Sequence, residues 1–318
     1  MSKCRICKSK NEKIINFGKI ALVGNFPKKN KKLKRYKISL NFCSKCKHVQ
    51  ISETINPDLL FRNYLWETGV SKSNIILIKD LIKKIKRFNI KKNSKVLEIA
   101  SNDGSLLNLF QKKFKCHVIG IDPAKNLKNK NIASIIDYFN FKLSKKIKIK
   151  FKTFNFIIAR NVVAHVHNPN EIFLGVNNLL SEEGIFIIEV PHLKNIIEKN
   201  QYDNIFHEHV GFHSLKSIID LSNKNNLKVF NVETIDSQGG SVRCYICKKK
   251  NKRKIDKNVK KVLDNERNIG LFSSKKLKKF KLKIIQHIFH LTKLIKNLKK
   301  MNKNISVYGA SGKGQALL

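Results

Sequence analysis

Proline, tryptophan, arginine and acidic residues are all scarce in this chain of 318 residues. It has five prolines, one tryptophan and 22 acidic residues, against 66 basic residues of which only eight are arginine. The resulting net charge of +44 would ordinarily point to nucleic acid or to an anionic membrane. However, the lysines are spread over the whole chain, and sites that read phosphate groups tend to concentrate arginine. We therefore expect a generally basic surface without a specific nucleic-acid partner, which would still attract an anionic substrate.

Long apolar runs are also lacking, since none approaches the roughly 20 residues that a membrane-spanning helix needs. The first residues do not resemble a signal peptide, because Cys4 and Cys7 fall where its charged and apolar regions should be. Further thiols at Cys116, Cys244 and Cys247 favour a reducing compartment. We expect a cytoplasmic protein that does not bind membranes.

Two Cys-x-x-Cys pairs, Cys4/Cys7 and Cys43/Cys46, predict a tetrahedral zinc site, because each short loop offers two thiolates. The long gap between the pairs is accommodated by a β-hairpin. A redox pair is the alternative, but no thioredoxin-like pattern surrounds it. His48 could replace one cysteine, although a role as a neighbour fits it better. A third pair, Cys244 and Cys247, lies in a strand-like run whose alternation places the two thiols on opposite faces, which indicates core packing.

The stretch 95–107 organises the centre of the chain. An apolar run with Glu98 leads into the polar turn 101–104 and then into helical spacing of Leu106, Leu107 and Phe110. This predicts a strand, a turn and a helix start, which together form a ligand site at the carboxyl end of a sheet. Gly104 is the only glycine of the turn, so the dinucleotide-binding pattern is absent. The turn resembles the first loop of class I S-adenosylmethionine (SAM) methyltransferases, although a strand and a glycine turn open any α/β unit.

Three further apolar runs predict buried strands. The first ends at Asp122, where an acid can accept hydrogen bonds from ribose hydroxyls. The second covers residues 154–159 and ends in Arg160 and Asn161, and the third covers 185–190. Helical segments lie between them, so we expect a mainly parallel, Rossmann-like sheet with right-handed crossovers.

An aromatic and small-polar cluster precedes this sheet, at Tyr64, Trp66, Thr68, Gly69 and Ser71. A helix with apolar spacing over 75–85 follows it. The cluster is either a packing anchor or a ligand contact, and the sequence favours neither.

Three histidines and an acid gather within 207–213, which read His-Glu-His-Val-Gly-Phe-His. The spacing is a weak signal for a metal, because the helical His-Glu-x-x-His register is absent. A general base fits better, since imidazole titrates near neutral pH and a flanking carboxylate can orient it. Downstream, a turn at Gly239 and Gly240 leads into a strand with Arg243, which could hold an anionic or carbonyl group; a plain tight turn is the alternative.

Together these motifs resemble the SAM-dependent C-methyltransferases of nucleotide-linked deoxysugars. The resemblance runs in order over nearly the whole chain, through the two cysteine pairs, residues 96–107, Gly-Ile-Asp-Pro-Ala (120–124), Asn-Val-Val-Ala-His-Val (161–166), Phe-His-Glu-His (206–209), Gly-Gly-Ser-Val-Arg (239–243) and Val-Tyr-Gly-Ala-Ser-Gly-Lys-Gly (307–314). It implies a zinc-binding domain, a Rossmann-like SAM-binding domain and a C-terminal α/β domain that helps to hold the nucleotide sugar.

The resemblance also implies roles for single residues. The SAM pocket would be lined by Glu98, Ser101, Asn102, Gly104, Asp122 and Asn161, with Asp122 on the ribose. His209 would be the base, with Glu208 as its partner and His165 reaching the same cleft. In a 4-keto sugar the carbonyl acidifies the C3 proton, so that a base of near-neutral pKa can remove it and the carbanion can attack the SAM methyl group.

Three positions depart from the family pattern. Ala100 stands where the family usually has glycine, Phe206 stands where it often has tyrosine, and Phe212-His213 replaces an aromatic pair. The last two put the identity of the sugar in doubt more than the fold.

We divide the chain into a zinc-binding domain (1–58), a SAM-binding domain (59–250), and a helical connector with the start of a C-terminal α/β domain (251–318). Residues from Ile305 onward read as a strand, a glycine loop and the start of a helix. Such a piece cannot bury a core, so we expect a truncated chain that lacks part of the sugar site. Two alternatives stay open, namely methylation of another enolisable acceptor, and a zinc-ribbon nucleic-acid binder with a degenerate methyltransferase fold. The sequence decides neither the sugar, the nucleotide nor the oligomeric state.

Overall fold

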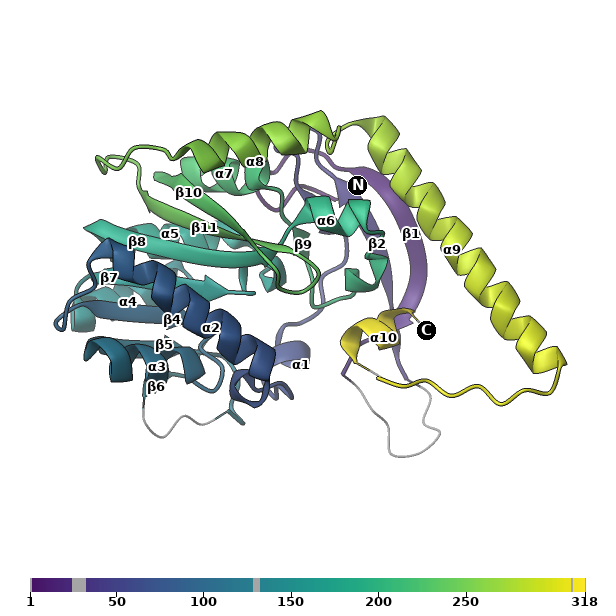
Figure 1. Cartoon of the computed structure of the whole chain (residues 1–318), viewed down its shortest axis with the longest axis horizontal. Coiled ribbons are helices and arrows are strands. Elements are labelled where there is room, and N and C mark those ends of the chain that lie inside the picture. Colours follow the sequence, from purple (N-terminus) through teal and green to yellow (C-terminus); the bar gives the residue numbers. More distant parts are fainter. Residues whose placement is uncertain (1, 25–32, 128–131, 310, 318) are drawn as a thin grey trace.

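The computed structural model in Figure 1 describes residues 2–24, 33–127, 132–309 and 311–317. A large sheet with helices on both faces forms one part of the molecule, and a small sheet with a long helix forms the other. The predicted α/β class is therefore confirmed.

The large sheet has the strand order β10-β11-β8-β7-β4-β5-β6. Strands β4 to β8 are parallel, and β11 runs antiparallel between β8 and β10. Central strands are apolar and buried on both faces, which is the pattern of parallel sheets. The strands are β4 (Lys95–Ile99), β5 (His117–Ile121), β6 (Ala133–Ile135), β7 (Phe154–Arg160), β8 (Leu180–Pro191), β10 (Leu227–Ile235) and β11 (Ser241–Lys248).

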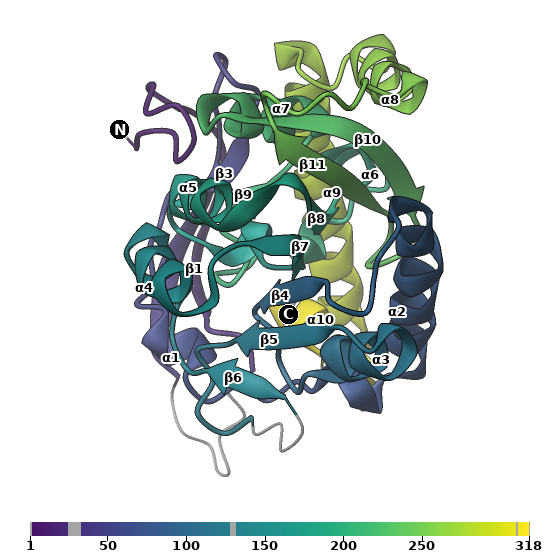
Figure 2. The same ribbon diagram turned by 90° about the vertical axis from the view of Figure 1, so that its left-hand side faces the viewer.

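Helices cover this sheet on two faces (Figure 2). One apolar cluster joins the strands to α4 (Phe141–Phe151), α5 (Pro169–Leu179) and α7 (Leu215–Lys224). A second cluster joins them to α2 (Lys72–Ile85) and α3 (Ser105–Phe114), and α2 confirms the helix predicted from the apolar spacing over 75–85. Cys244 belongs to the first cluster and Cys247 to the second, so the predicted packing of these thiols on opposite faces is confirmed.

The small sheet has the order β1-β2-β3-β9, with β1 (Glu12–Ala21), β2 (Arg35–Phe42), β3 (Val49–Ile51) and β9 (Gly211–Phe212). The antiparallel pair β1 and β2 is the hairpin predicted between the cysteine pairs. The sequence did not predict that β9, from the middle of the chain, completes this sheet by pairing with β3. Short elements elsewhere are α1 (Asp58–Phe61), η1 (Thr68–Val70), η2 (Lys86–Phe88), η3 (Val163–His165), α6 (Leu193–Glu198) and η4 (Tyr202–Asn204).

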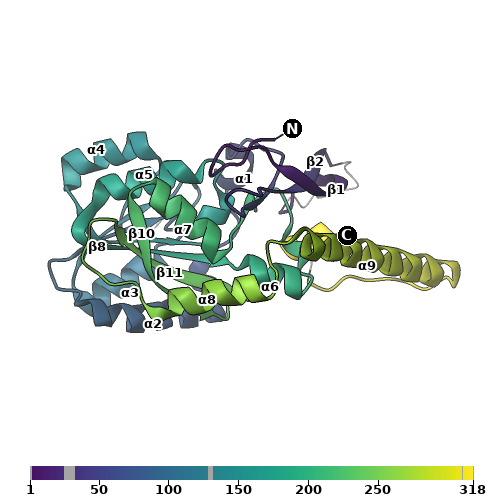
Figure 3. The ribbon, with the colours of Figure 1, turned by 90° about the horizontal axis from the view of Figure 1, so that it is seen from above.

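The C-terminal part consists of α8 (Lys257–Asn268), α9 (Ser274–Lys300) and α10 (Gly312–Leu317). Buried Glu266 of α8 accepts hydrogen bonds from the backbone N–H of Leu215 (2.6 Å) and from Nε2 of His192 (2.7 Å), which fixes α8 to the large sheet and to α7. Helix α9 starts against the small sheet through Leu277, Phe280 and Ile284 and then runs away from the body (Figure 3). None of the described helices is both long and apolar enough to cross a membrane.

The strand expected from Ile305 is wrong, because residues 303–309 form no strand. A strand needs a partner for its backbone groups, and this segment is exposed, with Tyr308 fully accessible. The helix expected after it is present as α10. Ala310 and Leu318, which belong to the same motif, lie outside the described residues.

Candidate active site and zinc centre

The four predicted zinc ligands, Cys4, Cys7, Cys43 and Cys46, lie together. Their sulfur atoms are all within 4.8 Å of one another, and the pairs Cys4/Cys46 and Cys7/Cys43 are each 3.4 Å apart. Four thiolates at 2.3 Å from a tetrahedral zinc ion would be about 3.8 Å apart, so the cluster fits one ion. His48 is not a member of the cluster and instead packs against His213, with ring centroids 4.7 Å apart. The prediction that His48 is only a neighbour is confirmed.

The zinc centre is tied to the loops of the large sheet. The Arg5 guanidinium donates to the main-chain carbonyls of His167 (3.2 Å) and Glu53 (3.1 Å), and the Arg5 N–H donates to Gln50 Oε1 (2.8 Å). Strand β3 then pairs with β9, so that the knuckles and the segment after His209 share one sheet. The hydrogen bonds of Arg5 and the pairing of β3 with β9 therefore connect the zinc centre to the segment that follows His209.

The turn after β4 is built from left-handed residues. Ala100, Asn102 and Gly104 have φ angles of 56°, 52° and 73°. The Asn102 N–H donates to Asp122 Oδ2 (2.8 Å), and the Ala124 N–H donates to Asp122 Oδ1 (2.8 Å). The carboxylate at the tip of β5 is thereby fixed beside the turn, and its remaining lone pairs can accept hydrogen bonds from a ligand.

We expect Ala100→Gly to raise the free energy of unfolding by about 0.5–1 kcal/mol. A left-handed alanine costs roughly 1–2 kcal/mol, and the greater entropy of glycine in the unfolded chain offsets part of this gain. Urea denaturation of both proteins would measure the difference. A loss of stability in the variant would show that the turn does not strain Ala100.

Four of the six predicted cofactor residues line one pocket: Ser101, Asn102, Gly104 and Asp122. Its other walls include Ala124, Leu127, Ile132 and Ile135, and its volume is about 310 Å³ with the space open to solvent. A polar rim of this kind beside apolar walls fits a nucleoside, whose ribose is polar and whose base is flat and apolar on its faces. The apolar walls were not predicted.

Glu98 and Asn161 do not line this pocket. Glu98 is buried, Glu98 Oε2 has no hydrogen-bond partner among the described residues, and burial raises the pKa of this carboxyl well above its usual range. Asn161 Oδ1 is likewise buried without a described partner. Unpartnered buried polar atoms are costly, so both suit a site that a polar ligand completes.

The segment 64–69 covers the turn. The Thr68 N–H donates to Asn102 Oδ1 (2.8 Å), the Gly69 N–H donates to Asp103 Oδ2 (2.6 Å), and Asn102 Nδ2 donates to the Trp66 carbonyl (2.8 Å). Trp66 itself is half exposed. The contact is therefore made by the backbone of this segment and not by its aromatic rings.

Tyr64 belongs to the segment that covers the turn 101–104, called the cofactor turn from here on. The loop 207–213 is called the histidine loop. Burial raises the pKa of the Tyr64 phenol, and the carboxylates of Glu208 and Asp122 raise it further. The Tyr64 ring packs against Phe61 with centroids 6.1 Å apart, and Phe61 lies 5.9 Å from His165, so this segment connects the turn to the histidines. The role of Tyr64 was left open by the sequence, because a tyrosine before a helix is usually a packing anchor.

The rings of His209 and His165 pack against each other, with centroids 4.9 Å apart. Nδ1 of His209 lies 2.7 Å from the main-chain carbonyl of Asn204. A carbonyl only accepts, so Nδ1 carries the proton and Nε2 keeps a free lone pair. Burial lowers the pKa of His209 to about 4 and that of His165 to about 3. Both rings are therefore neutral at pH 7.

Glu208 is not the hydrogen-bond partner of His209, which corrects the expected pair. The described hydrogen bond of His209 goes to Asn204, because successive residues of this loop point in different directions. The Glu208 carboxyl instead lies near Tyr64, and burial raises its pKa to about 7. Phe206, at the family's tyrosine position, stacks on His209 with ring centroids 4.2 Å apart.

The other two histidines of the loop make main-chain contacts. His207 Nε2 is 3.0 Å from the Lys37 carbonyl and joins the loop to β2, and His213 Nε2 is 3.4 Å from the Val163 carbonyl. Both side chains are buried, so their contacts hold the loop against its neighbours.

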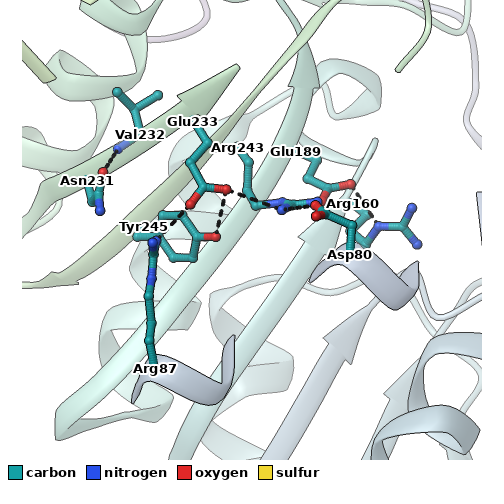
Figure 4. A network of polar contacts seen from close by, with 9 residues as sticks. All are labelled: Asp80, Arg87, Arg160, Glu189, Asn231, Val232, Glu233, Arg243 and Tyr245. Carbon is teal, nitrogen blue, oxygen red and sulfur yellow. Dashed lines mark hydrogen bonds and ion pairs between the residues drawn. The ribbon is translucent and has the colours of Figure 1, made fainter. Parts of the chain in front are cut away.

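Arg243 is not available to a substrate, which corrects the second expectation. Its fully buried guanidinium donates to Glu189 Oε1 (2.7 Å), Asp80 Oδ2 (2.8 Å) and Glu233 Oε2 (3.4 Å), as Figure 4 shows. Glu189 in turn accepts from Arg160 (2.8 Å). This network joins α2 to β7, β8, β10 and β11 beneath the cleft.

We expect Arg243→Met to lower the free energy of unfolding by about 3–5 kcal/mol, because it breaks a buried ion pair and leaves Glu189 with Arg160 as its one described cationic partner. Arg267→Met removes the exposed pair with Asp264 and should cost about 1 kcal/mol or less. Urea denaturation would measure both variants. Equal losses of unfolding free energy in the two variants would show that the Arg243 network does not stabilise the fold.

Family models match three successive parts of the chain. "Methyltransferase domain" matches residues 74–232, "Putative zinc binding domain" matches 4–61, and "C-methyltransferase C-terminal domain" matches 236–318. The chain belongs to the SAM-dependent C-methyltransferases with an N-terminal zinc-binding domain. This C-methyltransferase is therefore an enzyme of the class that the motifs indicated, and both its Rossmann-like fold and its zinc-binding domain are confirmed.

The C-methyltransferase is 27% identical over 327 residues to "C-methyltransferase NovU" of Streptomyces niveus, covering 100% of this chain and 78% of the relative. Solved structures resemble it more distantly. PH0226 protein from Pyrococcus horikoshii OT3 has a TM-score of 0.44 and 16% identity, covering 61% of this chain and 96% of its own. Magnesium protoporphyrin IX methyltransferase from Synechocystis PCC 6803 has a TM-score of 0.42 and 10% identity, covering 54% of this chain and 82% of its own.

Proposed function

We propose that this enzyme transfers the methyl group of SAM to C3 of a nucleotide-linked 4-keto deoxysugar after a base has removed the C3 proton. The observation that carries the proposal is the neutral imidazole of His209, whose Nδ1–H is held by the Asn204 carbonyl so that Nε2 can accept a proton. A base, a ribose-binding acid and a polar turn beside apolar walls are what carbon methylation by SAM requires. The motif resemblance supports the nucleotide sugar, and the positive surface would attract its diphosphate.

Each protein group has a defined task in this scheme. Asp122 would accept hydrogen bonds from the ribose, while the turn 101–104 holds the rest of the nucleoside. SAM supplies a methyl group on a positively charged sulfur. His209 Nε2 takes the C3 proton, and the Asn204 carbonyl stabilises the imidazolium through Nδ1–H. The buried Glu208 carboxyl and the Tyr64 hydroxyl border the acceptor and exchange protons or hydrogen bonds with it.

The test combines binding and turnover. Calorimetry should show SAM binding at micromolar strength, and mass spectrometry with isotope-labelled SAM should show one labelled methyl group on a nucleotide 4-keto sugar. The matched 4-hydroxy sugars are the control, because they lack the carbonyl that acidifies C3 and should not react. If the enzyme methylated a simple enolisable ketone but no nucleotide sugar, the proposed acceptor would be wrong. Salt-sensitive binding to RNA without SAM binding would contradict the proposal as a whole.

A further inference from the structure

Helix α10 lies beyond the carboxyl ends of β4 and β5 (Figures 1 and 2). It contacts η4, the element that contains Asn204 and thereby orients His209. Gln315 Oε1 accepts a hydrogen bond from the Gly24 N–H (2.7 Å), which anchors α10 to the end of β1. The helix therefore forms a wall beside the segment that orients His209, although it is about 100 residues from the histidine loop in sequence.

Lys313 lies on this wall and is half-buried. Its ammonium acts on His209: burial lowers the pKa of the imidazole most, the Asn204 carbonyl opposes the shift, and the positive charge of Lys313 lowers the pKa further. Lys313 forms no ion pair with a carboxylate in the described part of the chain. By contrast, Arg160 is paired with Glu189, and Arg62 is paired with Asp58.

We propose that Lys313 is a catalytic residue whose ammonium stabilises the enolate oxygen formed when His209 removes the acceptor proton. This inference rests on the proposed function. The carbonyl carbon is bonded to the carbon that loses its proton, so a cation whose charge acts on the base also acts on the oxygen that becomes negative. An ammonium fixed there favours the enolate over the ketone.

The step balances without a further reactant. The C3–H bond breaks, the proton goes to Nε2 of His209, and the electron pair passes through C3 and C4 to the oxygen near Lys313. When the new carbon–carbon bond forms, the pair returns to C3, and the bond between the methyl group and the sulfonium sulfur breaks with its electrons left on sulfur. No oxidant or reductant is needed.

Deuterium exchange isolates the first half of this reaction. The enzyme is incubated in D₂O with the 4-keto sugar nucleotide that the wild type methylates and with S-adenosylhomocysteine, which cannot donate a methyl group, and NMR follows the C3 proton. Lys313→Met should slow exchange by about 10²–10³-fold at saturating sugar, whereas its KM should change less than about threefold. Lys313→Arg keeps the charge and should recover part of the rate. Lys303→Met, an exposed lysine after α9, is the matched control and should exchange like the wild type.

The outcomes separate this inference from the function on which it rests. If Lys313→Met exchanges like the wild type, Lys313 does not stabilise the enolate. If its KM rises while exchange at saturation is unchanged, Lys313 binds an anionic group of the acceptor, and the enolate role is wrong. If the wild type itself exchanges no C3 proton, the proposed function fails, and the inference fails with it. Thermal melting of each variant establishes that it is folded.

Discussion

Replacing His209 by asparagine should lower the rate of methyl transfer by about 10²–10⁴-fold, the range expected for loss of a general base. SAM affinity should stay within about threefold of the wild type, because the cofactor pocket is formed by the turn after β4 and by Asp122, and His209 does not line it. The amide of asparagine occupies about the place of the ring atoms nearest Cβ, including Nδ1, and it is polar. The loop 201–214 should therefore keep its conformation. Calorimetry with SAM and a mass-spectrometric assay with labelled SAM would measure the two quantities separately.

His117→Asn is the matched control, since His117 is exposed at the start of β5 and away from the cleft. It should leave both quantities unchanged. Turnover of the His209 variant at the wild-type rate would show that the base is another residue. Glu208 would then be the first candidate, because burial raises the pKa of its carboxyl to about 7, and a general base works best when its pKa is near the pH of the reaction.

The pH dependence follows from the same burial. The active form of His209 is the neutral ring, and burial lowers its pKa to about 4. Protonation of this base should therefore reduce kcat/KM only below about pH 5, whereas an ordinary imidazole with a pKa near 6.5 would already lose activity at pH 6. A titration near pH 7 belongs to Glu208 in this account, and it should disappear in Glu208→Gln.

Loss of zinc should abolish methyl transfer while the SAM pocket survives. We expect Cys43→Ser to bind less than a tenth of the zinc of the wild type and to lose at least about 10²-fold in turnover, since the free energy of structural zinc binding is folding free energy for the knuckles. Without them β3 loses its support, and with it β9, which begins two residues after His209. Among the described residues no hydrogen bond joins the cofactor turn to the cysteine knuckles, so SAM affinity should fall less than about fivefold.

Cys116→Ser is the matched control, because Cys116 is a buried thiol outside the cluster. It should keep one zinc ion per chain and nearly full turnover. Elemental analysis by mass spectrometry gives the zinc content, and calorimetry gives the SAM affinity. A zinc-free variant that still transfers methyl groups at the wild-type rate would show that the zinc centre does not position His209.

Local sequence patterns predicted most of the large sheet. The apolar runs that became β4, β5, β7 and β8 are buried on both faces, and a buried run between turn residues is readable without knowing its neighbours. The cofactor turn was also predictable, because its polar residues and Gly104 follow one of these strands directly. The cysteine pairs were equally clear, since ligand spacing is a local property.

The predictions that failed concern pairings between residues that are distant in sequence. Strand β9 has two residues and exists only because β3 lies beside it, and the segment from Ile305 has strand-like residues but no described strand to pair with. Arg243 looked like a ligand group in sequence, but three carboxylates from other elements surround it. The hydrogen bond from His209 to Asn204, in place of Glu208, depends on the fold of a loop, which spacing does not determine.

The most direct test of the central claim is the position of the transferred methyl group. The enzyme is incubated with a nucleotide 4-keto deoxysugar and with SAM that carries a ¹³C label in its methyl group, and NMR of the product shows which atom the label is bonded to. The account predicts a methyl carbon bonded to C3, with that carbon no longer carrying the proton that His209 removed. A label bonded to oxygen or nitrogen would contradict it.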